Sequence, residues 1–387
     1  YYFLRQLMFV VIGLPMFFFV SRLRRRSLRI CVWLMYLAAV GGLLATKFTP
    51  LGVNMGNVER WIKLGPLTLQ VSEFAKIALI GVMADHWSRM APLSQRSMWP
   101  WLSTGALALP IVGLVFLQPH LSAALVLALI PFAIAFYADV PGRQMFKVVG
   151  LSLLLLVTVV GGATAMGKGL KPYQVERVTS FFSPEKDAKG ADYQKMQSER
   201  ALTNGGLFGY GPGNSPSKHG YLPAPHTDFI LAVIGEEWGL VGVLILLAAY
   251  GAMIFFCFHI GHCASSSFEA LLCAGIGTLL ALQVVCNAGV VTGTLPVTGM
   301  PLPLLSYGGS GLLCALLGIG MVLGVSRELS RKAAEMSQET SAENAETPAA
   351  SAMATPGAMA AQSLDEEYYE SHRVARTSRS AHAGVSA

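Results

Sequence analysis

The run Leu151-Ser-Leu-Leu-Leu-Leu-Val-Thr-Val-Val160 decides the fold class, because it is apolar without the alternation that a membrane-spanning β-strand shows. The whole chain has the same character: 53% of its residues are hydrophobic and only 13% are charged. Its apolar runs reach the roughly 20 residues that an α-helix needs to cross a bilayer. We therefore expect an all-α, polytopic membrane protein and reject a β-barrel.

Nine apolar segments have the length and composition of membrane spans. They lie near residues 4–20, 29–47, 72–88, 99–118, 121–138, 146–166, 228–258, 270–292 and 309–325. The segment 228–258 is longer than a bilayer requires, and Gly235-Glu-Glu-Trp-Gly239 interrupts it near one end. The two acids of this interruption need partners.

Basic residues in the short loops predict the orientation, because cytoplasmic loops carry an excess of Lys and Arg. The strongest signal is Ser21-Arg-Leu-Arg-Arg-Arg-Ser-Leu-Arg29. The other basic connections, which fall on the same side, hold Arg89, Arg96, Arg143, Lys147 and the stretch 327–332. The opposite, outer side then receives residues 48–71, the Gln118-Pro119 turn, a large loop over about 167–227, and residues 293–308.

The sequence divides into a transmembrane part, residues 1–330, and a tail, residues 331–387. The tail is rich in Ala, Ser, Glu and Thr without apolar periodicity, so we expect a disordered segment on the cytoplasmic side. An odd number of spans places Tyr1 outside, which predicts one helix before it and ten spans in all.

Several function classes are excluded. The glycine-rich stretch Gly205-Gly-Leu-Phe-Gly-Tyr-Gly-Pro-Gly213 lacks the Lys-Ser/Thr ending of a phosphate-binding loop. The six cysteines show no metal-ligand spacing. The net charge of +6 belongs mostly to the inner loops and tail, so it reflects membrane orientation and gives no reason to expect a nucleic-acid partner.

An acid at a membrane boundary is the leading candidate for chemistry. In Lys218-His-Gly-Tyr-Leu-Pro-Ala-Pro-His-Thr-Asp-Phe-Ile230, Asp228 stands where an apolar helix begins. Ionisable residues at membrane depth are expensive and usually functional. The alternative is structural: Thr227 or Asp228 is also a good helix N-cap.

The outer loop 48–71 holds a second group of candidates. Arg60, Trp61 and Lys63 either contact a substrate or form an interfacial anchor of one aromatic residue with flanking cations. Glu73 and Lys76 are three residues apart on one helical face, so we expect them to neutralise each other as a structural pair.

Two further outer segments carry candidates. The long loop contains Arg177 and Lys218, which could receive an anionic headgroup or could merely be solvated. The stretch 295–310 contains three prolines and a Gly-Gly pair, which enforce a non-helical backbone near membrane depth. Such backbone is tolerated only where it lines a cavity or is buried in protein.

These motifs together resemble the SEDS family of membrane glycosyltransferases, the FtsW, RodA and SpoVE proteins of bacterial cell-wall synthesis. The matching pieces cover nearly all of residues 1–330. They are Arg60-Trp-Ile62, Gln70-Val-Ser-Glu-Phe-Ala-Lys76, Gln118-Pro119, Gln197-Ser198, Gly205 to Gly211, Leu222-Pro223, His226-Thr-Asp-Phe-Ile230, Gly235-Glu-Glu-Trp-Gly239, and Leu295-Pro-Val-Thr-Gly299 through Ser306-Tyr-Gly-Gly-Ser310.

The resemblance implies a peptidoglycan glycosyltransferase with ten spans in the bacterial cytoplasmic membrane, with a cytoplasmic C-terminus. Its substrate would be lipid II, polymerised into glycan strands at the outer face, and Asp228 would be the catalytic base. The motif spellings favour the division branch, FtsW, over the elongation branch, RodA. The implied partners are a class B penicillin-binding transpeptidase and other division-complex membrane proteins.

A set of polar side chains is expected to bind substrate. It comprises Arg60, Trp61, Lys63, Gln118, Arg177, Ser215, Lys218, His226, Thr227, Ser306 and Ser310. No ligand cluster compels a metal, although a divalent cation, Mg²⁺ or Mn²⁺, at the pyrophosphate fits the chemistry.

Three positions depart from the family pattern: Val71, His120 and the pair Ala224-Pro225. The last two replace acids, so no cation role of those acids transfers to this chain. Two rival functions remain: a lipid II flippase, and a non-catalytic scaffold for a transpeptidase.

Overall fold

The computed structural model describes residues 2–55, 58–65, 67–118, 120–165, 191–219, 222 and 225–352. The chain divides into two compact units, Tyr1–Leu329 and Ser330–Ala387. The first unit contains the helical bundle and all the candidate site residues.

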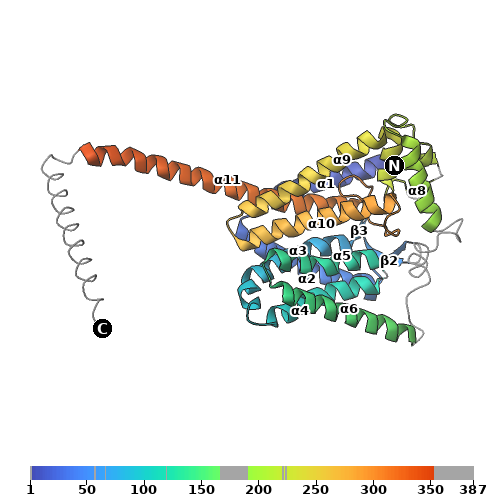
Figure 1. Cartoon of the computed structure of the whole chain (residues 1–387), viewed down its shortest axis with the longest axis horizontal. Coiled ribbons are helices and arrows are strands. Elements are labelled where there is room, and N and C mark those ends of the chain that lie inside the picture. The colour runs from blue at the N-terminus through green and yellow to red at the C-terminus, as the bar shows by residue number, and fades with distance from the viewer. Residues whose placement is uncertain are drawn as a thin grey trace, which may run out of the picture. The chain divides into compact units, whose positions relative to one another are not determined.

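The described chain is predominantly helical (Figure 1). Its α-helices are α1 (Tyr2–Val20), α2 (Arg25–Phe48), α3 (Val71–Ser94), α4 (Trp99–Leu117), α5 (Leu121–Tyr137), α6 (Gly142–Ala165), α8 (Ala191–Gly205), α9 (Ile230–Cys263), α10 (Ser267–Val291) and α11 (Gly309–Ala352). The short elements are β1 (Gly52–Met55), β2 (Val58–Leu64), β3 (Leu67–Gln70) and the 3₁₀ helix η1 (Pro216–His219).

Each of the nine expected spans coincides with a helix of the structure. Six of the described helices are long and apolar enough to cross a membrane by length and composition alone. These are α1, α2, α4, α9, α10 and the part of α11 up to Glu339. The protein is therefore a multi-pass α-helical membrane protein.

Helices α3 and α10 form the centre of the bundle. Helix α3 packs against α2, α4, α5 and α10, and α10 also packs against α9. The side chains of Ile77, Ile80 and Met83 on α3 are fully buried. Helix α3 also carries Glu73, Lys76 and Asp85, all buried, so its polar groups face protein and are kept away from lipid.

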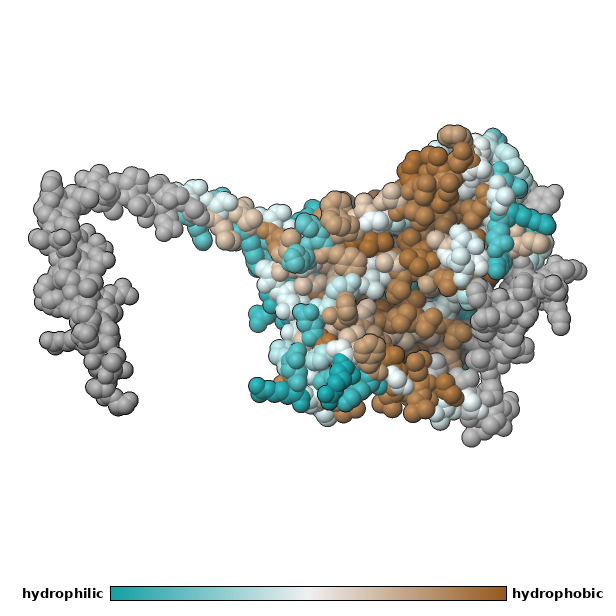
Figure 2. All heavy atoms as spheres, viewed as in Figure 1, coloured by the Kyte–Doolittle hydropathy of each residue, from teal (hydrophilic) through white to brown (hydrophobic). Residues whose placement is uncertain are grey.

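Helices at the periphery of the bundle expose apolar faces. Phe146 and Leu151 on α6 are 82% and 66% exposed, and Ile245 on α9 is 67% exposed. Figure 2 shows a brown apolar zone over the helices with hydrophilic side chains at its ends. Exposed apolar surface of this extent indicates contact with lipid or with other membrane helices.

Helix α9 bends at Gly239, whose φ of 67° and ψ of −168° are non-helical. The carbonyls of Glu236 and Glu237 accept hydrogen bonds from Tyr210 N and Gly211 N at 3.0 and 2.9 Å. In turn, Leu240 N and Val241 N donate to the carbonyls of Gly206 and Leu207, at 2.9 and 3.2 Å. The loop after α8 thus replaces the helical hydrogen bonds that the bend removes.

The segment 48–71, expected as a loop on the outer side, contains regular secondary structure. It forms a three-stranded antiparallel sheet in the order β1-β2-β3. Strands β2 and β3 pair Trp61 with Gln70 and Lys63 with Thr68. The pairing of β1 with β2 shifts at Arg60, because Val53 pairs with Trp61 and Asn54 pairs with Glu59. Such a bulge breaks the regular alternation of side chains along the strand.

Two segments differ from the expectations. Helix α11 continues to Ala352, whereas a span over 309–325 and a disordered tail from residue 331 were expected. The reason is local propensity, because residues 331–346 are rich in Ala and Glu, which are strong helix formers. The expected long loop contains helix α8, and its residues 166–190, like the tail residues 353–387, lie outside the described residues.

Candidate active site

A cavity of about 600 Å³ opens among α1, the sheet, the start of α5, the turn before α9 and the segment 296–312. Its lining includes six of the residues that the sequence predicted to be catalytic or substrate-binding. These are Arg60, Trp61, Thr227, Asp228, Ser306 and Ser310. Residues almost 250 positions apart in the chain are therefore brought to one site, and Asp228 is part of its wall.

The main chain at Asp228 is fixed by three hydrogen bonds to consecutive carbonyl groups. Tyr307 N donates to the His226 carbonyl at 2.8 Å, and Ser306 Oγ donates to the Thr227 carbonyl at 2.6 Å. Asn287 Nδ2 donates to the Asp228 carbonyl at 2.8 Å. Helix α9 begins at Ile230 with Phe229 at the N-cap position.

Two arginines line the same cavity as Asp228: Arg5 from α1 and Arg60 from β2. Arg60 Nε donates to the Gln118 carbonyl at 3.2 Å. The Gln118 side chain is buried and donates through Nε2 to the Leu43 carbonyl at 3.3 Å. Gln118 therefore supports Arg60 from behind, and it is not part of the cavity lining, where it had been expected to meet substrate.

The segment 296–304 lines the cavity without helical structure, as the sequence predicted. Three of its carbonyl groups nevertheless accept hydrogen bonds from side chains. Ser122 Oγ donates to the Thr298 carbonyl at 2.6 Å, Asn287 Nδ2 to that of Met300 at 2.8 Å, and Tyr250 OH to that of Pro303. These bonds explain how an irregular backbone is tolerated at this depth.

Two serines of the expected substrate-binding set also hold the site together. Ser306 Oγ accepts from Leu302 N at 2.7 Å in addition to donating to Thr227. Ser310 Oγ accepts from Gln70 N at 2.8 Å, which ties the end of β3 to the start of α11. Both serines also line the cavity. Their contact with substrate stays a prediction.

The expected pair of Glu73 and Lys76 is present. Lys76 Nζ lies 2.8 Å from Glu73 Oε1, and both side chains are almost fully buried. Glu73 also lines the cavity, whereas Lys76 faces inward, towards a smaller void beneath it. The pair provides charge compensation inside the bundle.

Four more of the expected substrate-binding residues, besides Gln118, lie elsewhere than in the cavity lining. Lys218 pairs with Glu237, and Ser215 Oγ donates to Glu236 Oε2, so these two residues are partners of the two acids of the α9 bend. The His226 ring packs against the Tyr2 ring at 4.8 Å between centroids. Lys63 is exposed on β2, and Arg177 lies outside the described residues.

The sequence reasoning missed three polar residues at the site. Arg5 and Gln283 line the cavity, whereas Asn287 is buried and bonded to the Asp228 carbonyl. All three interrupt apolar helices, α1 and α10, and such polar residues at membrane depth are a general sign of function. Arg5 was overlooked because it lies close to the start of the chain. Asn287 is 1% exposed and has no local motif that distinguishes it from a packed polar residue.

The geometry can be compared with known proteins. A family model described as "Cell cycle protein" (FtsW, RodA, SpoVE) matches residues 1–331. The chain belongs to this family.

Relatives of this chain carry names that agree with the family. The chain is 35% identical over 331 residues to the probable peptidoglycan glycosyltransferase FtsW of Coxiella burnetii, and the match covers 85% of this chain and 87% of that protein. It is 34% identical over 335 residues to the stage V sporulation protein E of Bacillus subtilis, covering 84% and 86%. The expectation of a glycosyltransferase of the SEDS class is confirmed.

Solved structures share the fold. A chain from a study entitled "Structural coordination of polymerization and crosslinking by a peptidoglycan synthase complex" has a TM-score of 0.70 and 32% identity, covering 85% of this chain and 90% of that one. The rod shape determining protein RodA of Thermus thermophilus has a TM-score of 0.60 and 30% identity, covering 84% and 87%. The expected fold class is therefore confirmed.

Proposed function

We propose that this FtsW/RodA/SpoVE-family protein polymerises lipid II into glycan strands at the outer face of the cytoplasmic membrane, for septal wall synthesis. One observation carries the proposal: Asp228 lines a single cavity together with two arginines, Arg5 and Arg60. Glycosyl transfer from a pyrophosphate donor needs a proton acceptor and positive charge at the leaving group.

The proposed reaction assigns one role to each of these groups. The 4-hydroxyl oxygen of one lipid-linked saccharide attacks the anomeric carbon of another, and its proton passes to the Asp228 carboxylate. The bond between the anomeric carbon and the pyrophosphate oxygen breaks, and undecaprenyl pyrophosphate leaves with the electron pair. Arg5 and Arg60 stabilise the developing negative charge, because guanidinium groups match phosphate oxygens. An α-linked donor gives a β-1,4 product.

The protein offers no preformed metal site in the described residues, where no three His, Cys, Asp or Glu side chains are grouped to hold an ion. A Mg²⁺ or Mn²⁺ ion at the pyrophosphate would need most of its oxygen ligands from the substrate and from water.

The partner proposed is a class B penicillin-binding transpeptidase, together with other membrane proteins of the division complex. Support comes from the structurally similar chain, whose study concerns polymerisation and crosslinking by one synthase complex. The FtsW names of several relatives favour division over elongation. The arginine cluster Arg22 to Arg29, on the inner side by the loop-charge rule, supports a cytoplasmic C-terminus.

The test is polymerisation of fluorescent lipid II by the purified protein with its transpeptidase partner. Asp228→Asn keeps the shape of the side chain and removes its basicity, so glycan chains should fall at least about 100-fold, as for loss of a general base. The variant should still bind the partner.

Polymer formation by the Asp228→Asn protein at the wild-type rate would contradict the proposed function. Transfer of lipid II across liposomes without polymer would instead support a flippase. Normal growth of cells that depend on the variant would support a scaffold.

A further inference from the structure

Asn287 stands out among the buried polar groups because its amide nitrogen donates two hydrogen bonds, one of them to the Asp228 carbonyl. Its side chain is 1% exposed. Nδ2 lies 2.8 Å from the Asp228 carbonyl and 2.8 Å from the Met300 carbonyl. The residue therefore joins α10 to the turn that carries Asp228 and to the irregular segment 296–304, and both of these line the cavity.

The orientation of this amide is fixed. Exchanging its nitrogen and oxygen would set Oδ1 against two carbonyl oxygens, and acceptors do not bond to acceptors. In the present orientation Oδ1 is buried with no hydrogen-bond partner among the described residues. A fold tolerates an unsatisfied buried acceptor at a cost, and such exceptions call for a functional explanation.

Asn287 does not belong to the cavity lining, although Asp228, Thr298 and Pro301 do. It therefore acts on the reaction through the residues it holds and has no contact with substrate of its own. A shift of the Asp228 main chain would move its carboxylate relative to the acceptor hydroxyl, and a displacement of about 1 Å can lower a rate about 100-fold.

We infer that Asn287 is a positioning residue of the glycosyltransferase site. By bonding to the main chain of Asp228 and of the 296–304 segment, it sets the distance from the Asp228 carboxylate to the acceptor hydroxyl. This inference rests on the proposed function. It predicts that loss of the amide lowers kcat and leaves the KM for lipid II unchanged, because the substrate contacts themselves remain.

The variants are Asn287→Ala, which removes both donors, and Asn287→Gln, which keeps them on a side chain one methylene longer. In the lipid II polymerisation assay, Asn287→Ala should lower kcat about 10- to 100-fold with KM within about 2-fold of wild type. Asn287→Gln should recover part of the loss, with a kcat between those of Asn287→Ala and wild type.

Ser198→Ala is the matched control. Ser198 is fully buried, and its Oγ donates to the carbonyl of Val291, the last residue of α10, at 2.8 Å. It ties α8 to α10 without touching the Asp228 turn. It should lower the thermal midpoint of unfolding in detergent to an extent similar to the Asn287 variants, while its kcat stays at the wild-type level.

A folded Asn287→Ala protein with wild-type kcat would overturn the inference, and so would a loss of kcat that merely follows the loss of thermal stability in both Asn287 and Ser198 variants. Should Asn287→Ala not fold, Asn287→Gln decides: wild-type kcat overturns the inference, and lowered kcat with unchanged KM supports it.

Asp228→Asn is assayed alongside the Asn287 variants. If it makes polymer, the proposed function itself fails; if it is inactive while Asn287→Ala is fully active, only the role of Asn287 fails.

Discussion

At the scale of single residues, burial and pairing separate the charged groups that can meet substrate from those that cannot. Asp228, Arg5 and Arg60 line the cavity, whereas Lys218 is held by Glu237 at the α9 bend. The sequence indicated that the two acids of this bend need partners. It could not reveal which cations supply them, because such a pairing depends on how α8, the loop after it and α9 pack.

A comparison of two cations on strand β2 tests the proposed anion site. Arg60 lines the cavity and Lys63 is exposed, although both are equally plausible phosphate ligands from sequence alone. Arg60→Ala should raise the KM for lipid II or lower kcat/KM by about 10- to 100-fold, since a hydrogen bond to a charged group contributes about 1.5–3 kcal/mol. Lys63→Ala should change kcat/KM by less than about 2-fold. Equal effects of the two variants in steady-state polymerisation would remove Arg60 from the site.

At the scale of elements, each of the nine predicted apolar runs coincides with a helix of the described residues, because a bilayer imposes length and composition on every span. The small sheet and helix α8 were not predicted. Strand β2 mixes charged, aromatic and aliphatic residues from Val58 to Leu64, so its pattern resembles a polar loop. Helix α8 is a polar helix whose position depends on packing against α9.

The contact between α8 and α9 depends on Gly205. A Cβ atom added to this residue would overlap the Gly235 carbonyl oxygen, which is backbone and cannot move aside cheaply. Gly205→Ala should therefore destabilise the fold by about 1–3 kcal/mol, the usual cost of overpacking. Gly113→Ala in α4 is the control, because nothing lies within 4 Å of the position that its added methyl group would occupy. Thermal unfolding in detergent should show a lowered midpoint for the first variant alone; equal midpoints would contradict the close approach of α8 and α9.

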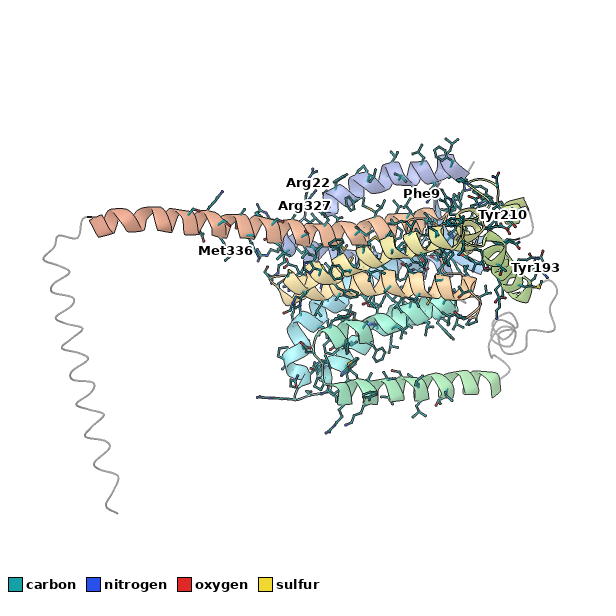
Figure 3. All side chains as sticks on the ribbon, turned by 45° about the horizontal axis from the view of Figure 1, so that its top comes forward. Phe9, Arg22, Tyr193, Tyr210, Arg327 and Met336 are labelled. Carbon is teal, nitrogen blue, oxygen red and sulfur yellow. The ribbon has the colours of Figure 1, made fainter. Side chains whose placement is uncertain are left out.

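At the scale of the whole bundle, the chemistry and the basic surface lie at opposite ends. Figure 3 shows Arg22 and Arg327 at one end of the helices and Tyr193 and Tyr210 at the other. Arg327 Nη1 donates to Ser21 Oγ at 2.8 Å, which joins the start of the α1–α2 turn to α11 at the basic end. This separation agrees with the proposed topology, in which the arginines face the cytoplasm and the site receives a lipid-linked sugar from outside.

The central claim is that the cavity beside Asp228 binds lipid II with its pyrophosphate between Arg5 and Arg60. The most direct measurement is a cryo-electron microscopy structure of the inactive Asp228→Asn protein with lipid II and its transpeptidase partner. We predict pyrophosphate density within hydrogen-bonding distance of both guanidinium groups and a sugar hydroxyl beside residue 228. Lipid II density at the basic end of the bundle, or a cavity closed to the saccharide, would contradict the account.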